Sequence, residues 1–223
     1  MTIPTDPRAV IFDLDGVLVD SEGLHVDAWK LLFAQQGMTV TDEEYEHGIG
    51  MTDVAWIRWL FARRGEPVDA SWWQCAKREL YADILARNVR PFPGVLELVD
   101  RLAAEGFRLG VASSSWRENI ETVVAALRLC GRFGALVGKE DVARHKPDPE
   151  AYLLAADRLG VAPRACTVIE DSVLGIRAAA AAGMRCIAVP TSLPADRLTE
   201  ADVVFDTLED ADAVVAFARR SAT

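Results

Sequence analysis

The sequence predicts an α/β fold in which a doubly wound parallel sheet is interrupted by an inserted, all-helical domain. Two observations support this prediction. After residue 106, short apolar runs alternate with helix-like segments, as strands and crossover helices do in parallel sheets. Residues 21–88, in contrast, show only helical periodicity and are followed by the helix-breaking sequence PFPG at residues 91–94. We therefore expect a Rossmann-like core with a helical cap.

The chain has 223 residues and is 51% hydrophobic, which is enough to bury a core in one domain or in two small ones. We expect residues 1–19 and 91–223 to form the Rossmann-like core and residues 20–90 to form the cap. Four tryptophans at helix spacing are predicted to pack inside the cap rather than to bind a ligand: Trp56, Trp59, Trp72 and Trp73.

The strands are predicted from short apolar runs that end in polar or turn residues, the pattern of buried parallel strands. The predicted strands are residues 9–14, 107–113, 135–138, 165–171, 185–190 and 202–205. The helices predicted in the core are residues 117–129, 148–159, 174–182 and 208–218. Pro149 in the first turn of the second helix and Gly183 after the third are typical of helix ends.

Charge and composition exclude several classes of protein. The net charge of −10 disfavours binding to nucleic-acid backbones and to anionic membranes. The four cysteines form no CxxC pair and have no histidine at zinc-binding spacing. The N-terminal residues do not resemble a signal peptide, and no segment approaches the ~18 apolar residues of a membrane span. We expect a soluble, cytoplasmic protein without nucleic-acid or membrane partners.

Polar side chains follow the predicted strands where these strands end. They are Asp13 and Asp15, Ser113, Ser114 and Ser115, Lys146, and Glu170 and Asp171. Any one of them alone is more commonly a turn or helix-capping residue. However, ligands of open parallel sheets bind outside the carboxyl ends of the strands, so these groups should converge. Clustered carboxylates need a cation to stay ionised together, and a carboxylate-bound Mg²⁺ beside a lysine and hydroxyls is typical of a phosphate site.

These motifs resemble those of the haloacid dehalogenase (HAD) superfamily. FDLDGVLVDSE at residues 12–22 resembles its DxDGxxxDxx signature, and VASSS, HKPDPEAY and VIEDSVLGIRAAAAAGM follow in the family's order. The helical segment, with HVDAWK at residues 25–30, is similar to the cap of the β-phosphoglucomutase-like subgroup. The resemblance covers nearly the whole chain.

The resemblance implies roles for the polar residues of the core. Asp13 would be the nucleophile that forms an aspartyl phosphate, and Asp15 would be the general acid and then the general base. Asp13, Asp171 and the backbone carbonyl of Asp15 would bind Mg²⁺, with Glu170 as a further ligand or as a partner of the ligands. Lys146 would neutralise the phosphate oxygens.

The resemblance also implies residues that bind the substrate. The core would contribute the hydroxyl of Ser113, the backbone N–H of Ser114, and Ser115. The cap would contribute Gly48 and Ile49, within the segment at residues 47–53. His25 would also bind substrate or restrain Asp15, and the alternative is an ordinary polar residue on a helix face.

The function that the resemblance implies is a Mg²⁺-dependent phosphatase for a small phosphorylated metabolite, with a sugar or sugar-alcohol phosphate favoured. We expect a monomer or a weak homodimer. The alternative is a hexose-phosphate mutase of the β-phosphoglucomutase type. Met51 stands where such mutases carry an arginine that grips a second phosphate, which favours the phosphatase.

Three other functions fit the sequence less well. A receiver-type phosphoacceptor module is about half this length and lacks an acid two residues after its acceptor. A haloacid dehalogenase needs no metal and no acid at the position of Asp15. A phosphonate-cleaving enzyme would need a Schiff-base lysine in the cap, where Lys30 and Lys77 are the candidates.

Overall fold

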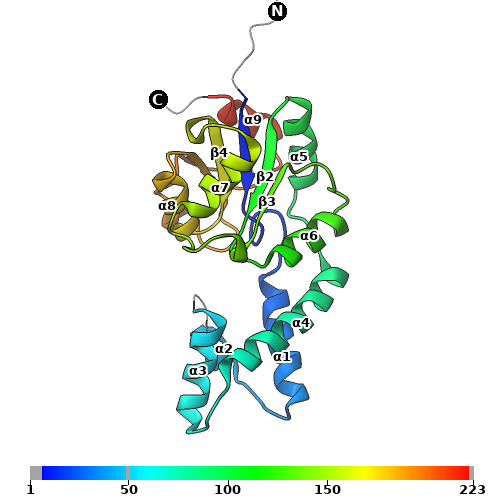
Figure 1. Ribbon diagram of the computed structural model, residues 1–223, viewed down its shortest axis with the longest axis vertical. Coiled ribbons are helices and arrows are strands. Elements are labelled where there is room, and N and C mark those ends of the chain that lie inside the picture. The colour runs from blue at the N-terminus through cyan, green and yellow to red at the C-terminus, as the bar shows by residue number, and fades with distance from the viewer. Residues whose placement is uncertain (1–6, 49–50, 221–223) are drawn as a thin grey trace, which may run out of the picture. The chain divides into compact units, whose positions relative to one another are not determined.

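The computed structural model describes residues 7–48 and 51–220 (Figure 1). The described chain forms two compact units. The first, which we call the sheet unit, runs up to Asp20 and resumes at Val89. The second, the helical unit, is Ser21–Asn88. Among the described residues, no helix is both long enough and apolar enough to cross a membrane.

The sheet unit contains a six-stranded, fully parallel sheet with the order β3-β2-β1-β4-β5-β6. The strands are β1 Ala9–Phe12, β2 Arg108–Ala112, β3 Ala135–Val137, β4 Cys166–Glu170, β5 Arg185–Ala188 and β6 Val203–Val204. All six predicted strands are present, and the predicted fold class is confirmed. The chain order reverses beside β1, which lies between β2 and β4, and this is where open α/β sheets bind their ligands.

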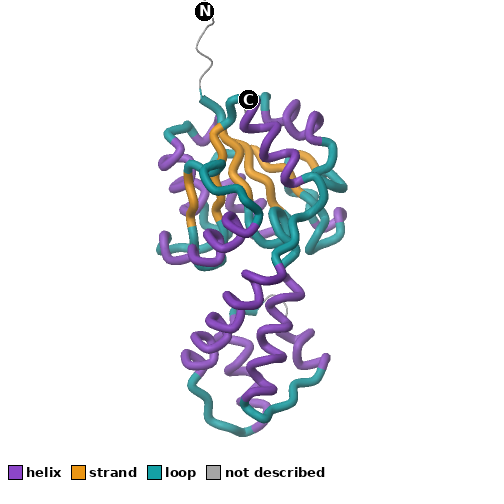
Figure 2. Tube along the Cα trace, turned by 90° about the vertical axis from the view of Figure 1, so that its right-hand side faces the viewer, coloured by secondary structure: helices purple, strands orange, loops and turns teal. Residues whose placement is uncertain are grey.

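Helices lie on both faces of the sheet (Figure 2). They are α5 Val95–Ala104, α6 Arg117–Ala126, α7 Glu150–Leu159, α8 Val173–Ala181 and α9 Ala211–Ala218, with short 3₁₀ turns η1 Lys139–Asp141, η2 Pro163–Ala165 and η3 Ala195–Arg197. The four predicted helices are present. The last one was predicted to begin at residue 208, but it begins after Asp210, whose side chain caps it by accepting from the Ala213 N–H.

Helix α5 was not predicted from the sequence. Its buried residues are Val95, Leu98, Val99 and Leu102, which follow the spacing of an amphipathic helix. The preceding PFPG sequence is typical of a helix breaker, but its Gly94 is the N-cap residue of this helix.

The core forms because successive residues of β1 face opposite sides of the sheet. Ala9 and Ile11 pack with residues of α7 and α8, including Tyr152. Val10 and Phe12 therefore face the other side, and both are fully buried. Burial of such side chains contributes roughly 1.5–3 kcal/mol each to folding.

The helical unit consists of α1 Glu22–Gln35, α2 Asp42–Gly48, α3 Asp53–Arg64 and α4 Ala70–Asn88. Its aromatic core contains Trp56 and Trp73, and Trp59 packs against this core while partly exposed. Trp72 is 45% exposed, so its predicted place in the core is wrong. Adjacent residues of a helix point about 100° apart, and Trp72 lies outside the face of α4 that Trp73 buries.

Gly94 allows a first test of the packing. Its φ is +81°, and a Cβ there would lie 2.5 Å from the Cα of Glu209 and from the carbonyl oxygen of Leu208. Gly106 has the same φ, but nothing lies within 4 Å of its Cβ position. We expect Gly106→Ala to cost about 1 kcal/mol and Gly94→Ala at least ~2 kcal/mol more, because backbone must move.

The measurement is the free energy of unfolding of both variants in urea. Equal losses for Gly94→Ala and Gly106→Ala would contradict the close approach of the two backbone segments at Gly94.

Candidate active site

The turn after β1 presents the first carboxylates. The backbone N–H of Asp13 donates to the carbonyl of Ile169 at 3.0 Å, which fixes Asp13 beside the end of β4. The chain then turns tightly: the Gly16 N–H donates to Val19 at 3.0 Å, and the Val19 N–H donates back to Leu14 at 3.1 Å. Asp13 is therefore held at the centre of the sheet's carboxyl edge, where it is buried.

Lys146, from the loop between β3 and α7, binds two carboxylates at once. Its Nζ lies 2.6 Å from Oδ1 of Asp13 and 2.7 Å from Oε1 of Glu170, and it donates to the carbonyl of Ala112 at 3.2 Å. The side chain is only 7% exposed. Burial lowers the pKa of Lys146, but the charges of Asp13 and Glu170 outweigh burial and raise this pKa above its usual value. Lys146 is therefore a charged ammonium.

Glu170, the last residue of β4, is fully buried and accepts hydrogen bonds from five donors. Oε1 accepts from Lys146 and from the Tyr152 hydroxyl at 2.7 Å. Oε2 accepts from the backbone N–H of Asp171 at 2.9 Å, and from the N–H and hydroxyl of Ser172 at 3.0 and 2.9 Å. Burial raises the pKa of Glu170, but the Lys146 charge and these hydrogen bonds bring it below its usual value. Glu170 is ionised.

Asp171 differs from its neighbour in its electrostatics. Burial and then the charge of Glu170 raise the pKa of Asp171 to about 7, although the Ser192 hydroxyl donates to its Oδ2 and lowers it. Burial also raises the pKa of Asp13 well above its usual value, helped by the neighbouring carboxylates and opposed by the lysine. A Cβ at Gly16 would lie 1.9 Å from Oδ2 of Asp171, so only glycine leaves room for this carboxylate.

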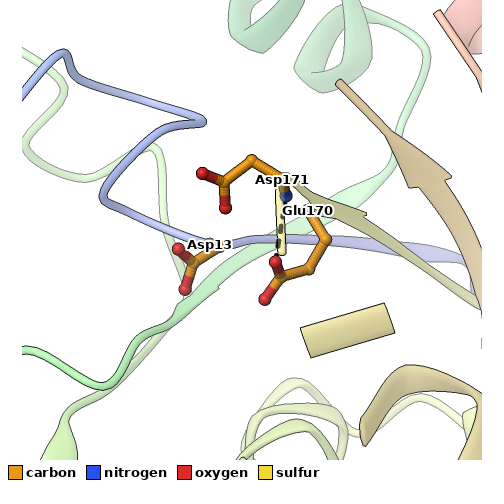
Figure 3. Close-up of side chains that lie close together, drawn as sticks. All are labelled: Asp13, Glu170 and Asp171. Carbon is orange, nitrogen blue, oxygen red and sulfur yellow. Dashed lines mark hydrogen bonds between the residues drawn. The ribbon is translucent and has the colours of Figure 1, made fainter. Parts of the chain in front are cut away.

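The three carboxylates of Asp13, Glu170 and Asp171 form a group that could hold a metal ion (Figure 3). One ligand oxygen from each lies within 4.8 Å of the others. Three carboxylates beside one ammonium leave an excess of negative charge, and hard oxygen donors suit a divalent cation such as Mg²⁺. The described residues donate no hydrogen bond to Oδ2 of Asp13 or Oδ1 of Asp171, which leaves both atoms available. The residues therefore fit a metal.

The serines after β2 form a connected set. Ser113 is buried; its N–H donates to Val137 at 3.0 Å, and its hydroxyl accepts from the Ser115 N–H at 3.0 Å. The Ser115 hydroxyl donates to Oδ2 of Asp15 at 2.5 Å. Ser114 is exposed on the same loop. The sheet unit thus brings together the polar residues that the sequence predicted at its strand ends, except Ser114, which has no contact with the other site residues among the described side-chain hydrogen bonds.

The site residues predicted in the cap lie in the helical unit, except Ile49, which is outside the described residues. The His25 ring stacks on Tyr81 with centroids 3.9 Å apart, and its Nδ1 lies 2.8 Å from Nζ of Lys77. Lys77, which is 5% exposed, also donates to Asp53 at 3.4 Å. His25 is therefore part of a charged, hydrogen-bonded cluster inside this unit.

Gly48 has a packing role of its own. A Cβ at Gly48 would lie 2.8 Å from the indole ring of Trp56. A cavity of about 220 Å³ in the helical unit is lined by His25, Val26, Trp29, Tyr45, Gly48, Met51, Asp53 and Trp56. The small residue thus permits the indole to close one wall of this cavity.

Three residues that contact the carboxylates were missed in the sequence: Tyr152, Ser172 and Ser192. Ser172 and Ser192 follow strands β4 and β5, so the rule that located Ser113 would also have located them. Tyr152 gave no such signal, because it lies within the apolar pattern of α7. Only the structure shows that its hydroxyl faces Glu170.

Known proteins are similar to this chain in sequence and in fold. A family model described as haloacid dehalogenase-like hydrolase matches residues 10–189. Protein CbbY of Rhodobacter capsulatus is 35% identical over 197 residues, which cover 82% of this chain and 86% of that protein. Hexitol phosphatase B of Escherichia coli strain K12 is 34% identical over 198 residues, which cover 85% and 86%.

A solved structure, the putative β-phosphoglucomutase from Thermotoga maritima, matches with a TM-score of 0.81 and 28% identity, covering 94% of this chain and 99% of that chain. The family model and the relatives above 30% identity each span most of the sequence. The chain therefore belongs to the haloacid dehalogenase-like hydrolase family.

Proposed function

We propose that this hydrolase is a Mg²⁺-dependent phosphatase that releases phosphate from a small phosphorylated metabolite, with a sugar or sugar-alcohol phosphate as its substrate class. The observation that carries the proposal is the placement of the Lys146 ammonium between Asp13 and Glu170, with Asp171 beside them. A nucleophilic carboxylate, a fixed cation and metal-binding oxygens then meet in one buried place. The similarity to hexitol phosphatase B supports the substrate class.

In the proposed reaction, a carboxylate oxygen of Asp13 attacks the phosphorus, and the bond from phosphorus to the leaving oxygen breaks. Asp15 gives its proton to that oxygen, so the alcohol departs and an aspartyl phosphate remains. Asp15 then takes a proton from water, which attacks the phosphorus and releases inorganic phosphate. Asp13 is thereby regenerated.

Other residues hold the participants in place. Lys146 would neutralise the phosphoryl oxygens, because its Nζ is already 2.6 Å from the nucleophile. The Ser115 hydroxyl orients Asp15, and Ser113 would donate to the phosphoryl group. Mg²⁺ would be held by Asp13, Asp171 and the backbone carbonyl of Asp15, with Glu170 beside them, and would offset the repulsion between carboxylates and phosphate.

A hexose-phosphate mutase is the second candidate, since the fold matches a putative β-phosphoglucomutase. A mutase must bind a second phosphate. Met51 lines the cavity of the helical unit, and among the described residues that line it there is no arginine or lysine. This composition favours the phosphatase.

The first prediction concerns the nucleophile. We expect Asp13→Asn to lower the rate of phosphate release from monoesters more than about 10³-fold, because an amide cannot form the acyl phosphate. The matched control is Asp157→Asn, an exposed carboxylate on α7. Phosphate release and circular dichroism are measured for both variants. A folded Asp13→Asn protein with undiminished turnover would rule out the assigned nucleophile.

The second prediction concerns the metal. Mg²⁺ added to metal-stripped protein should raise the unfolding temperature, because binding to the folded state at 100 times its Kd adds about 2.7 kcal/mol. Asp171→Asn should weaken this response, whereas Glu43→Gln, at an exposed carboxylate, should not. Sodium chloride at equal ionic strength is the reference. The proposed metal site is wrong if Asp171→Asn responds to Mg²⁺ as the wild type does.

The third prediction separates the two candidate functions. A panel of phosphorylated sugars, polyols, glycolate and nucleotides, assayed with Mg²⁺ and then with a chelator, should give metal-dependent phosphate release from one or more members. With β-glucose 1-phosphate and a bisphosphate activator, we expect no isomerisation, since Met51 stands where mutases carry an arginine and the described residues that line the cavity include no arginine or lysine. Formation of glucose 6-phosphate would instead favour the mutase.

A further inference from the structure

We propose that Tyr152 is a positioning residue, whose hydroxyl shares a Glu170 oxygen with Lys146 and thereby holds the ammonium against Asp13. This inference rests on the proposed function, since it assigns Tyr152 a part in phosphoryl transfer without contact to the substrate. Neither the sequence motifs nor the similar proteins assign this hydroxyl a role.

Tyr152 contacts the group formed by Glu170, Lys146 and Asp13 at its Glu170 end. The Tyr152 hydroxyl donates to Oε1 of Glu170 at 2.7 Å, and the same oxygen accepts from Nζ of Lys146 at 2.7 Å. Nζ also lies 4.8 Å from the centroid of the Tyr152 ring. The lysine is thus bounded by the ring, by Glu170 and by Asp13, and its position depends on all three.

Packing of the side chain does not account for the Tyr152 hydroxyl. Tyr152 is fully buried. Its side chain belongs to the apolar cluster formed by α7, α8 and the sheet. A phenylalanine would fill the same volume, and burying a hydroxyl costs free energy unless it is hydrogen-bonded. Among the residues that the structure describes, the hydrogen-bond partner of this hydroxyl is the carboxylate that binds Lys146.

The hydroxyl changes how Glu170 competes for the lysine. Oε1 of Glu170 accepts from both Lys146 and the Tyr152 hydroxyl, so its hydrogen bond to Lys146 is weaker than it would be with one donor. Glu170 can then bind Lys146 while Lys146 keeps its contact with Asp13. Without the hydroxyl, Lys146 would be the remaining side-chain donor on Oε1. We expect the ammonium then to move toward Glu170 and away from the position where a phosphoryl oxygen would be bound.

The test is Tyr152→Phe, which keeps the ring and removes the hydroxyl. We expect kcat/KM for a monoester substrate to fall about tenfold, and the inhibition constant of orthovanadate to rise by a similar factor, because a hydrogen bond to a charged network is lost. Thr167→Val is the matched control: it removes another buried hydroxyl from the sheet, on β4, which accepts a hydrogen bond from Arg185. It should leave kcat/KM unchanged.

A double-mutant cycle with Lys146→Ala separates positioning from general stability. If Tyr152 acts through Lys146, adding Tyr152→Phe to Lys146→Ala should change kcat/KM less than twofold. The same four proteins are unfolded in urea, where the loss in the double variant should be smaller than the sum of the single losses. This second readout holds even where Lys146→Ala hydrolyses too slowly to measure.

Two outcomes would overturn the inference: unchanged kcat/KM and vanadate inhibition in Tyr152→Phe, or additive losses in the unfolding cycle. Both outcomes differ from the result that would contradict the proposed function, in which the wild-type protein releases phosphate from no monoester. In that case the unfolding cycle still reports whether Tyr152 and Lys146 are coupled.

Discussion

The placement of one ammonium group between two buried carboxylates is the interaction on which this site depends. Lys146 lies within 2.7 Å of both Asp13 and Glu170, and all three side chains are almost fully removed from water. Removing one partner of a buried charged set typically costs roughly 3–5 kcal/mol, because the other charges are left uncompensated. The site therefore requires four parts of the chain to be positioned together: the loop that carries Lys146, the ends of β1 and β4, and the hydroxyl of Tyr152.

The parallel sheet makes this convergence possible. In the register of β1 with β4, Phe12 is opposite Ile169, so the residues that follow, Asp13 and Glu170, lie side by side at the carboxyl edge of the sheet. Strand β2 on the other side of β1 ends at Ala112, whose carbonyl accepts from Lys146. Charged groups far apart in the sequence are thus brought together by strand pairing, and apolar burial of the strands supplies the free energy that offsets their desolvation.

The sequence predicted the features that follow from strand ends, and it failed where the deciding contact is between distant elements. Asp13, Lys146 and Asp171 could be located because polar residues that follow buried strands share one edge. The role of Gly48 in packing against Trp56 and the direction of the Tyr152 hydroxyl depend on contacts across space, which periodicity does not encode. Helix α5 is a different case: its apolar spacing is present in the sequence, but the Pro and Gly residues directly before it are equally typical of a loop.

The contrast between Glu170 and Asp171, neighbours in the chain, indicates which carboxylate a cation would compensate. Glu170 accepts from Lys146, from Tyr152 and from donors at the start of α8, and its pKa lies below the usual value. A Cβ at Gly175 would lie 1.7 Å from its Oε1, so the first turn of α8 is shaped to admit this carboxylate. Asp171 is buried beside that negative charge, and its pKa is raised to about 7. Because Glu170 accepts from five protein donors while Asp171 accepts from one described donor, the Ser192 hydroxyl, we expect a divalent ion to be held chiefly by Asp171 and Asp13, with Glu170 serving chiefly to hold the lysine.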